Sequence, residues 1–265
     1  MRWILILTLL GFVSPALACG GGQRCEIPGG YYLAQAPSQW DGVTPLPVVI
    51  FYHGWNASPE GMMKNAAMVR SINDRGALFV VPYAQTGYWR QIGAGRAEGG
   101  RDELAYTRAL LADVTARWPV DQGRMLATGF SRGGSMVWNL ACYAGDEFTA
   151  FVPIAGGFWN STPADCPSGP INLRHIHGET DSVVAFDSIG IYNSMPIPEG
   201  MSVLRKLNGC GTDPDETSQG SRYECTNWNS CGSGRALSLC LHPMGHSIPA
   251  EWVGEAYDWM ISLED

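Results

Sequence analysis

Residues 125–134 read Met125-Leu-Ala-Thr-Gly129-Phe-Ser131-Arg-Gly-Gly134. An apolar run ends in a glycine, a serine follows two residues later, and a segment with helical apolar spacing begins at Arg132. A strand, a tight glycine-rich turn and a helix, in this order, present the serine hydroxyl at the carboxyl edge of a sheet. The pattern Gly-x-Ser-x-Gly is short, so its context gives it meaning. It predicts Ser131 as a nucleophile on a sharp turn.

Strand and helix patterns alternate on both sides of this turn. Continuous apolar runs predict strands, and apolar residues at helical spacing predict helices. The predicted strands are residues 47–53, 77–81, 124–130, 148–154, 171–177 and 235–241, and the predicted helices are 103–118, 132–143 and 250–263. This alternation indicates an α/β fold, a doubly wound and mostly parallel sheet with helices on both faces. No repeat or linker interrupts it, so we expect a single domain.

The N-terminus reads as a secretory leader. Met1 and Arg2 give a positive start, residues 3–13 are apolar, and Ala16-Leu17-Ala18 provides small residues for cleavage. This pattern predicts a signal peptide over residues 1–18 and a catalytic domain over residues 19–265. The protein is therefore expected to be secreted or periplasmic. Cys19 would become the first mature residue, which leaves a lipid-modified cysteine as the alternative.

The composition excludes several classes of protein. Hydrophobic residues make up 45% of the chain and charged residues 16%, which is typical of a globular domain rather than a disordered one. The formal net charge is −8, and no run of Lys or Arg occurs. We therefore expect no nucleic-acid partner. The apolar run at the N-terminus is too short for a membrane span.

The mature chain holds eight cysteines, an even number that suggests disulfides in an exported protein. The short paired spacings of zinc sites do not occur among them. The expected bridges are Cys142–Cys166 and Cys19–Cys25. Two more are expected within the cluster of Cys210, Cys225, Cys231 and Cys240, with their pairing open.

A serine nucleophile needs a histidine base and an acid that orients it. In a chain of this topology they follow in the order Ser, Asp or Glu, His. Asp181 follows the predicted strand 171–177, and His246 follows the predicted strand 235–241, so both are expected at the edge that carries Ser131. Glu179 and Asp187 are the alternative acids.

Other histidines offer different interpretations. His242 and His246 are four residues apart, a spacing that suits a metal on a helix, but Pro243 and Gly245 disfavour a helix there. We therefore expect no metal ligand at this position. His175 and His177 alternate along one predicted strand, where they are either a ligand-facing pair or core histidines.

The turn after the first central strand, His53-Gly54-Trp55, is expected to complete an oxyanion hole. We assign its donors to the backbone N–H groups of Trp55 and Arg132. His53 is expected beside the substrate, with a structural hydrogen bond as the alternative. Three aromatic residues on neighbouring loops, Tyr88, Trp89 and Trp159, are expected to bind the acyl group.

These motifs carry a family resemblance. The turn at residues 53–55, the block 121–134, His177-Gly-Glu-Thr-Asp181 and Gly245-His246-Ser-Ile-Pro249 resemble the secreted feruloyl esterase and polyhydroxybutyrate depolymerase group of the α/β-hydrolase superfamily. The resemblance implies an α/β-hydrolase fold and an extracellular serine carboxylesterase without metal or organic cofactor. It implies Ser131, Asp181 and His246 as nucleophile, acid and base. This chain departs from the group at Arg132, where a small or amide residue is common.

The expected substrates are hydroxycinnamoyl, short-chain or polyhydroxyalkanoate esters, with a plant cell-wall polysaccharide or a polyester as the polymeric partner. Two interpretations from other classes stay open. One is a serine peptidase of the same fold, because such a triad also cleaves amides. The other is a catalytically silent secreted binding protein.

Overall fold

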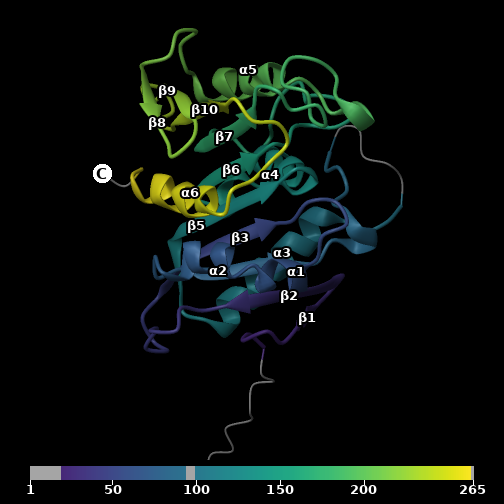
Figure 1. The fold of residues 1–265 in the computed structure, drawn as a ribbon, viewed down its shortest axis with the longest axis vertical. Helices are drawn as coiled ribbons and strands as arrows, with labels where there is room; N and C mark the ends of the chain where they lie inside the picture. Colours follow the sequence, from purple (N-terminus) through teal and green to yellow (C-terminus); the bar gives the residue numbers. More distant parts are fainter. Residues whose placement is uncertain (1–18, 94–98, 264–265) are drawn as a thin grey trace, which may run out of the picture.

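The structure is a computed structural model that describes residues 19–93 and 99–263. The predicted signal peptide, residues 1–18, lies outside the described residues. The strands are β1 (Cys25–Ile27), β2 (Gly30–Gln35), β3 (Leu46–Tyr52), β4 (Leu78–Pro82), β5 (Val120–Phe130), β6 (Ala150–Ile154), β7 (Leu173–Gly178), β8 (Glu216–Gln219), β9 (Glu224–Trp228) and β10 (Leu237–His242). They join into one ten-stranded sheet in the order β1-β2-β4-β3-β5-β6-β7-β10-β9-β8 (Figure 1).

The six central strands run parallel to one another and are, in sheet order, β4, β3, β5, β6, β7 and β10. The strands at both edges are antiparallel. These six are the strands that the sequence predicts, with small shifts at their ends; β5 begins earlier, at Val120. The mostly parallel sheet is therefore confirmed. The carboxyl ends of β3, β6 and β7 point to the same side of the molecule in Figure 1. Loops that follow these ends can meet there.

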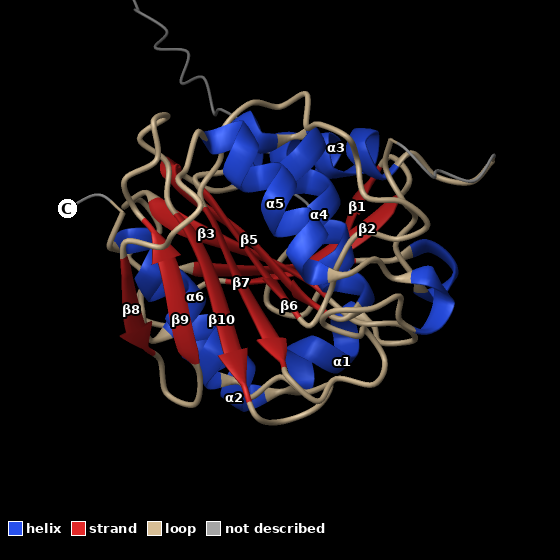
Figure 2. Ribbon diagram, turned by 90° about the horizontal axis from the view of Figure 1, so that it is seen from above, coloured by secondary structure: helices blue, strands red, loops and turns tan. Residues whose placement is uncertain are grey.

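Helices cover both faces of the sheet. They are α1 (Pro59–Lys64), α2 (Ala66–Asn73), α3 (Glu103–Arg117), α4 (Arg132–Tyr143), α5 (Ile197–Asn208) and α6 (Glu251–Ile261), with short 3₁₀ turns at Gln85–Gly87, Gly145–Glu147 and Ile191–Asn193. Helices α3, α4 and α5 lie on one face, and α1, α2 and α6 lie on the other (Figure 2). The predicted single domain with helices on both faces agrees with this arrangement.

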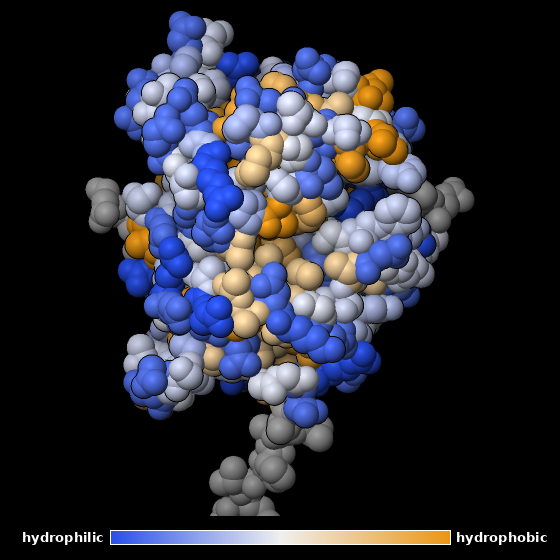
Figure 3. Space-filling view, in the orientation of Figure 1, coloured by the Kyte–Doolittle hydropathy of each residue, from blue (hydrophilic) through white to orange (hydrophobic). Residues whose placement is uncertain are grey.

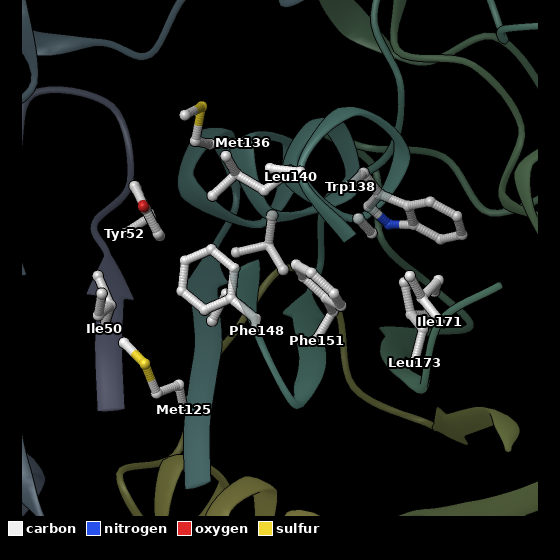
Figure 4. Close-up of a cluster of buried hydrophobic side chains, with 14 of the residues drawn as sticks. Ile50, Tyr52, Met125, Met136, Trp138, Leu140, Phe148, Phe151, Ile171 and Leu173 are labelled. Carbon is white, nitrogen blue, oxygen red and sulfur yellow. The ribbon is translucent and has the colours of Figure 1, made fainter. Parts of the chain in front are cut away.

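Two hydrophobic cores result, one on each face of the sheet. Along β3, Val48 and Ile50 contribute to the core under α3, α4 and α5, and Val49 and Phe51 contribute to the core under α2 and α6. All four are at most 1% exposed. Because both faces are buried, the strand is apolar at every position, which explains why it is visible in the sequence. Figure 4 shows the first core, where Leu140 and its neighbours on α4 lie over the sheet.

Four disulfides join parts of the described chain: Cys19–Cys25, Cys142–Cys166, Cys210–Cys231 and Cys225–Cys240. The first two confirm the predicted pairs, and the last two confirm two bridges within the final cluster. The structure supplies the pairing that the sequence leaves open. Cys225 and Cys240 are opposite one another on β9 and β10, so this bridge fastens the antiparallel edge to the central sheet.

Candidate active site

The site is built on the turn between β5 and α4. Ser131 has φ 56° and ψ −122°, a backbone conformation that is strained for a residue with a side chain. The turn can form because its neighbours are glycines. A Cβ on Gly133 would overlap the carbonyl oxygen of Tyr52, and one on Gly129 would crowd the same oxygen. The glycines thus let α4 start directly against β3, which exposes the Ser131 side chain at the sheet edge.

Three predicted residues meet at this edge. The Nε2 atom of His246 lies 2.8 Å from the Ser131 Oγ, and its Nδ1 atom lies 2.7 Å from the Asp181 Oδ2. An ionised carboxylate only accepts, so Nδ1 carries the proton and donates to Asp181. Nε2 is then the acceptor for the Ser131 hydroxyl. This arrangement can draw the proton away from Ser131.

The Asp181 carboxylate is held by several donors. Its side chain is fully buried, and its Oδ1 accepts from the backbone N–H groups of Val183 at 2.8 Å and Val184 at 2.9 Å. Burial acts to raise the pKa of Asp181, but the hydrogen bonds from His246 and these two N–H groups outweigh it and hold the pKa below its usual value. The alternative acids Glu179 and Asp187 are exposed, so Asp181 is the carboxylate that the structure brings to His246.

The loop that carries Asp181 rests on a chain of buried hydrogen bonds. Trp138 can only donate, so its Nε1–H donates to the Nδ1 of His175 at 3.3 Å. His175 then donates from Nε2 to the Nδ1 of His177 at 2.9 Å, and His177 donates from Nε2 to the Val184 carbonyl at 2.8 Å. Burial lowers the pKa of both histidines, which favours the neutral forms that this chain needs. They are core histidines that support the acid loop.

His242 takes no part in the hydrogen bonds of the site, because both of its ring nitrogens are buried without a partner among the described residues. The ring of His242 is buried and lies 4.6 Å from the ring of Trp252 on α6. It makes no pair with His246, which follows it on a loop without helical structure. Within residues 19–93 and 99–263, no three His, Cys, Asp or Glu side chains gather as metal ligands do.

The turn after β3 approaches the nucleophile. A Cβ on Gly54 would lie 3.6 Å from the Ser131 Cβ, so this turn is in van der Waals range of the elbow. The backbone N–H of Arg132 is the first of α4 and has no acceptor within the helix. Among the described residues, the N–H of Trp55 also donates to no protein group. The two N–H groups predicted as oxyanion donors therefore belong to adjoining segments and are available to a ligand.

A cavity of about 330 Å³ opens beside Ser131. The residues that line it follow five strands, β3 to β7, and are Trp55, Tyr88, Ser131, Arg132, Trp159, Asn160, Val183 and Tyr192. The rings of Trp159 and Tyr192 stack at 6.2 Å between centroids, and Trp55 meets Tyr192 edge-on at 5.8 Å. The Trp159 indole N–H donates to the Ser135 hydroxyl at 2.5 Å, which fixes this ring from behind.

Tyr88 and Trp159 lie at the cavity as the sequence predicts, and the Trp55 residue predicted as an oxyanion donor lines it too, whereas two predicted contacts do not. Trp89 is 1% exposed and His53 is fully buried. The Trp89 indole N–H donates to the His53 carbonyl at 2.8 Å, and its ring packs edge-on against Tyr52. His53 donates from Nδ1 to the Gly54 carbonyl at 2.9 Å. Both residues therefore shape the turn after β3 from beneath, and their expected place beside the substrate is corrected.

Sequence reasoning missed Asn160, Val183 and Tyr192 at the cavity. Asn160 directly follows Trp159, a predicted contact, and this position in the sequence was the signal that could have found it. Tyr192 has φ 61° and lies in a loop without a regular apolar pattern. That loop also exposes Ile189 and Ile191, and Figure 3 shows apolar side chains gathered over the loops between β7 and α5. Only the folded chain brings this loop to Ser131.

Comparison with curated proteins gives relatives that share most of their length with this chain. Feruloyl esterase C of Emericella nidulans is 29% identical, over 97% of this chain and 95% of that protein. The probable feruloyl esterase C of Aspergillus oryzae is 27% identical, over 96% and 92%. No protein-family model matches the chain. The predicted resemblance to feruloyl esterases is confirmed.

Two solved structures with the same fold are esterases by name. An acetyl xylan esterase from Aspergillus awamori superposes with a TM-score of 0.66 at 15% identity, over 89% of this chain and 98% of that one. A carboxylesterase of Bacillus cereus gives a TM-score of 0.54 at 13% identity, over 88% and 93%. At such low identity these likenesses establish the fold, which is that of the α/β-hydrolases. Together with the sequence relatives, they support a carboxylic ester hydrolase.

Proposed function

We propose that this chain is a secreted serine esterase in which Ser131 is the nucleophile, His246 the general base and Asp181 the acid that orients it. The observation that carries the proposal is the unbroken hydrogen-bonded line from Ser131 through His246 to Asp181, beside a cavity. His246 takes the Ser131 proton as Oγ attacks the ester carbonyl, and Asp181 stabilises the imidazolium that forms.

The remaining steps follow from the same atoms. As the carbonyl oxygen gains negative charge, it accepts hydrogen bonds from the backbone N–H groups of Trp55 and Arg132. His246 then gives its proton to the leaving alcohol, and an acyl group stays on Ser131. His246 then deprotonates a water molecule that attacks this acyl-enzyme, and it returns the proton to Ser131 Oγ as the bond to the acyl group breaks and the acid is released. Each step moves one proton between named atoms and needs no cofactor.

The cavity favours a flat acyl group. Trp55, Tyr88, Trp159 and Tyr192 offer ring faces and edges around Ser131. Rings of this kind bind an aromatic or short acyl chain well, whereas the volume is small for a long lipid chain. The likeness to feruloyl esterases points the same way. We therefore assign hydroxycinnamoyl and short-chain esters as substrates, with the ester on a cell-wall polysaccharide or a polyester as the polymeric form.

Secretion is part of the proposal. Four disulfides within the described residues are typical of proteins from oxidising compartments. They complement the leader pattern of residues 1–18, which lies outside the described range. The structure also offers no helix, among the residues it describes, with the length and apolar character of a membrane span.

A substrate panel on the purified protein tests the function. We expect hydrolysis of methyl ferulate and p-nitrophenyl acetate, and little hydrolysis of peptide anilides or long-chain triglycerides. An Ser131→Ala preparation serves as the control for contaminating esterases. Cleavage of the anilides in preference to the esters would indicate a peptidase, and turnover of none of them would favour a binding protein; both outcomes contradict the proposal.

A further inference from the structure

The guanidinium of Arg132 is a partly buried charge at the wall of the cavity. Its Nε donates to the Trp89 carbonyl at 2.8 Å, and its Cζ atom lies 4.4 Å from the centre of the Trp159 ring. Its Nη1 is buried and has no acceptor. Among residues 19–93 and 99–263, no carboxylate lies within ion-pair distance of this guanidinium. One backbone carbonyl and two aromatic rings, those of Trp159 and Tyr88, thus surround this positive charge, and Glu103 acts on it only from beyond ion-pair distance.

A second arginine shows how this fold otherwise treats such a group. Arg101 is paired with Glu103 at 2.6 Å, and both side chains are at most 5% exposed. Arg101 also donates to the carbonyls of Gly29 and Tyr83. A buried charge is costly to leave unpaired, and Arg101 meets that requirement within the protein. Arg132 does not.

The guanidinium stays charged despite its surroundings. Burial lowers the pKa of Arg132 to about 10, which is well above neutral pH. The same loss of water strengthens any ion pair that forms there, because the local dielectric constant is lower than in bulk water. A negatively charged group that reached Arg132 would therefore gain more than at a typical surface arginine.

The position of Arg132 defines what can reach it. Its backbone N–H faces the proposed oxyanion position, and its side chain lines the same cavity as Tyr88 and Trp159. An acyl group attached to Ser131 thus has its carbonyl at one end of this residue. We expect the rest of such an acyl group to lie among the aromatic rings that line the cavity, where its far substituents can approach the guanidinium.

We propose that Arg132 binds an anionic oxygen at the far end of an aromatic acyl group, so that the enzyme prefers esters whose acyl part carries a second, ionised acid. This inference rests on the proposed esterase function and adds a substrate class to it. The ring of the acyl group packs against Trp159 and Tyr192, and its carboxylate supplies the counter-ion that Arg132 lacks in the protein.

Two esters of similar shape test the proposal. The first is 4-carboxycinnamic acid esterified with methanol at its cinnamoyl carboxyl group, so that the ring carboxyl group stays free and is ionised at pH 7. The second is the methyl ester of 4-methylcinnamic acid, which carries a methyl group in place of the ring carboxylate. We expect kcat/KM to be about 10- to 100-fold higher for the carboxylate, the range expected for a hydrogen bond between charged groups. The two values are divided by the alkaline hydrolysis rates of the esters to remove differences in intrinsic reactivity.

Variants assign this preference to one side chain. Arg132→Met should bring the ratio of kcat/KM values close to one, and Arg132→Lys should restore part of it. Arg174→Met is the matched control, because Arg174 is another partly buried arginine, 4.9 Å from the Trp259 ring and away from the cavity lining. It should keep the wild-type ratio.

The ratio is independent of any uniform loss of activity in these variants. A wild-type ratio near one, or an Arg132→Met protein with the wild-type ratio, would overturn the proposal. In either case both esters would still be hydrolysed, so the esterase function would stand. Failure of the function itself would look different, since wild-type protein would hydrolyse neither ester.

Discussion

The two sides of the candidate active site differ in whether their polar groups have hydrogen-bond partners in the protein. On the acid side, after β7 and β10, each oxygen of Asp181 accepts a hydrogen bond from the protein. The hydrogen-bonded chain through the two core histidines begins at the Trp138 indole N–H and ends at the Val184 carbonyl. On the cavity side, the Arg132 guanidinium at the start of α4 has an unpartnered nitrogen. Trp55, after β3, and Tyr192, in the loop between β7 and α5, are both more than half exposed.

This difference separates preorganisation from recognition. A base that must accept a proton at one moment needs a fixed orientation before substrate arrives, and the acid side supplies it. A cavity that must bind a ligand needs groups whose partners are still missing. Changes on the acid side should therefore reduce turnover, whereas changes on the cavity side should alter which substrate is bound.

The largest effect is expected at Ser131 itself. Ser131→Ala removes the nucleophile but keeps the N–H groups of the turn, so turnover should fall by about a million-fold and a small residual rate should remain. Ser135→Ala is a matched control on α4, because this hydroxyl only anchors Trp159 and Gly157. It should raise KM by about tenfold at most. Equal losses in kcat for the two variants, measured with p-nitrophenyl acetate, would contradict the contrast.

Asp181→Asn tests the orienting acid. An amide can donate to His246 Nδ1, which would place the imidazole in the wrong tautomer for accepting the Ser131 proton. Turnover should fall by about ten-thousand-fold while the fold is retained, as measured by steady-state kinetics and circular dichroism. Glu179→Gln, in the same loop but exposed, is the control. A loss of less than tenfold in Asp181→Asn would remove Asp181 from its proposed role.

Two tryptophans on the cavity side distinguish support from contact. Trp89→Ala should destabilise the protein by about 3–5 kcal/mol, because it empties a buried site and frees the His53 carbonyl. Trp55→Ala should leave the free energy of unfolding nearly unchanged, since Trp55 is 57% exposed, and should raise KM for methyl ferulate by about tenfold. Urea denaturation and kinetics separate the two effects. A destabilised Trp55→Ala with normal KM would show that this ring packs rather than binds.

Acid should weaken the fold through its buried histidines. Burial lowers the pKa values of His53, His175, His177 and His242 in the folded protein, whereas unfolded histidine titrates near about 6.5. Below this pH the unfolded state binds protons that the folded state does not. Stability is thus complete above about pH 6.5 and falls towards the folded-state pKa values, by at most about 1.4 kcal/mol per pH unit for each histidine.

Urea denaturation at pH 7.5, 6 and 5 and constant ionic strength measures this loss. The lowered pKa of Asp181 acts in a separate and more acidic range, because its contribution is present above about pH 3.9 and is lost only as the pH falls through its folded-state value. A free energy of unfolding that stays constant from pH 7.5 to 5 would show that the histidines are not held neutral by burial.

The sequence predicted the centre of the sheet better than its edges. The central strands are buried on both faces, so a continuous apolar run marks each of them. The edge strands β8 and β9 are rich in polar residues, and β1 is three residues long, so none has this pattern. Helices α1, α2 and α5 were also missed. The first two are only six and eight residues long, and α5 begins at a proline-rich loop without a side-chain cap.

The same limit applies to the site. Ser131, Asp181 and His246 were predictable because each follows a strand whose carboxyl end fixes its place. The aromatic residues were not equally predictable. Trp89 and Tyr88 are neighbours on one loop, yet the first turns into the core and the second faces the cavity. Side-chain direction in a loop depends on contacts with distant segments, which no local pattern records.

Covalent labelling tests the central claim most directly. A fluorophosphonate reacts with a serine hydroxyl only when a base activates it, so the purified protein should take up one label, and mass spectrometry should locate it on the peptide that contains Ser131. Ser131→Ala should take up none, and Asp181→Asn should react much more slowly. A label on a different residue, or equal labelling of wild-type protein and Ser131→Ala, would contradict the assignment of Ser131 as the nucleophile.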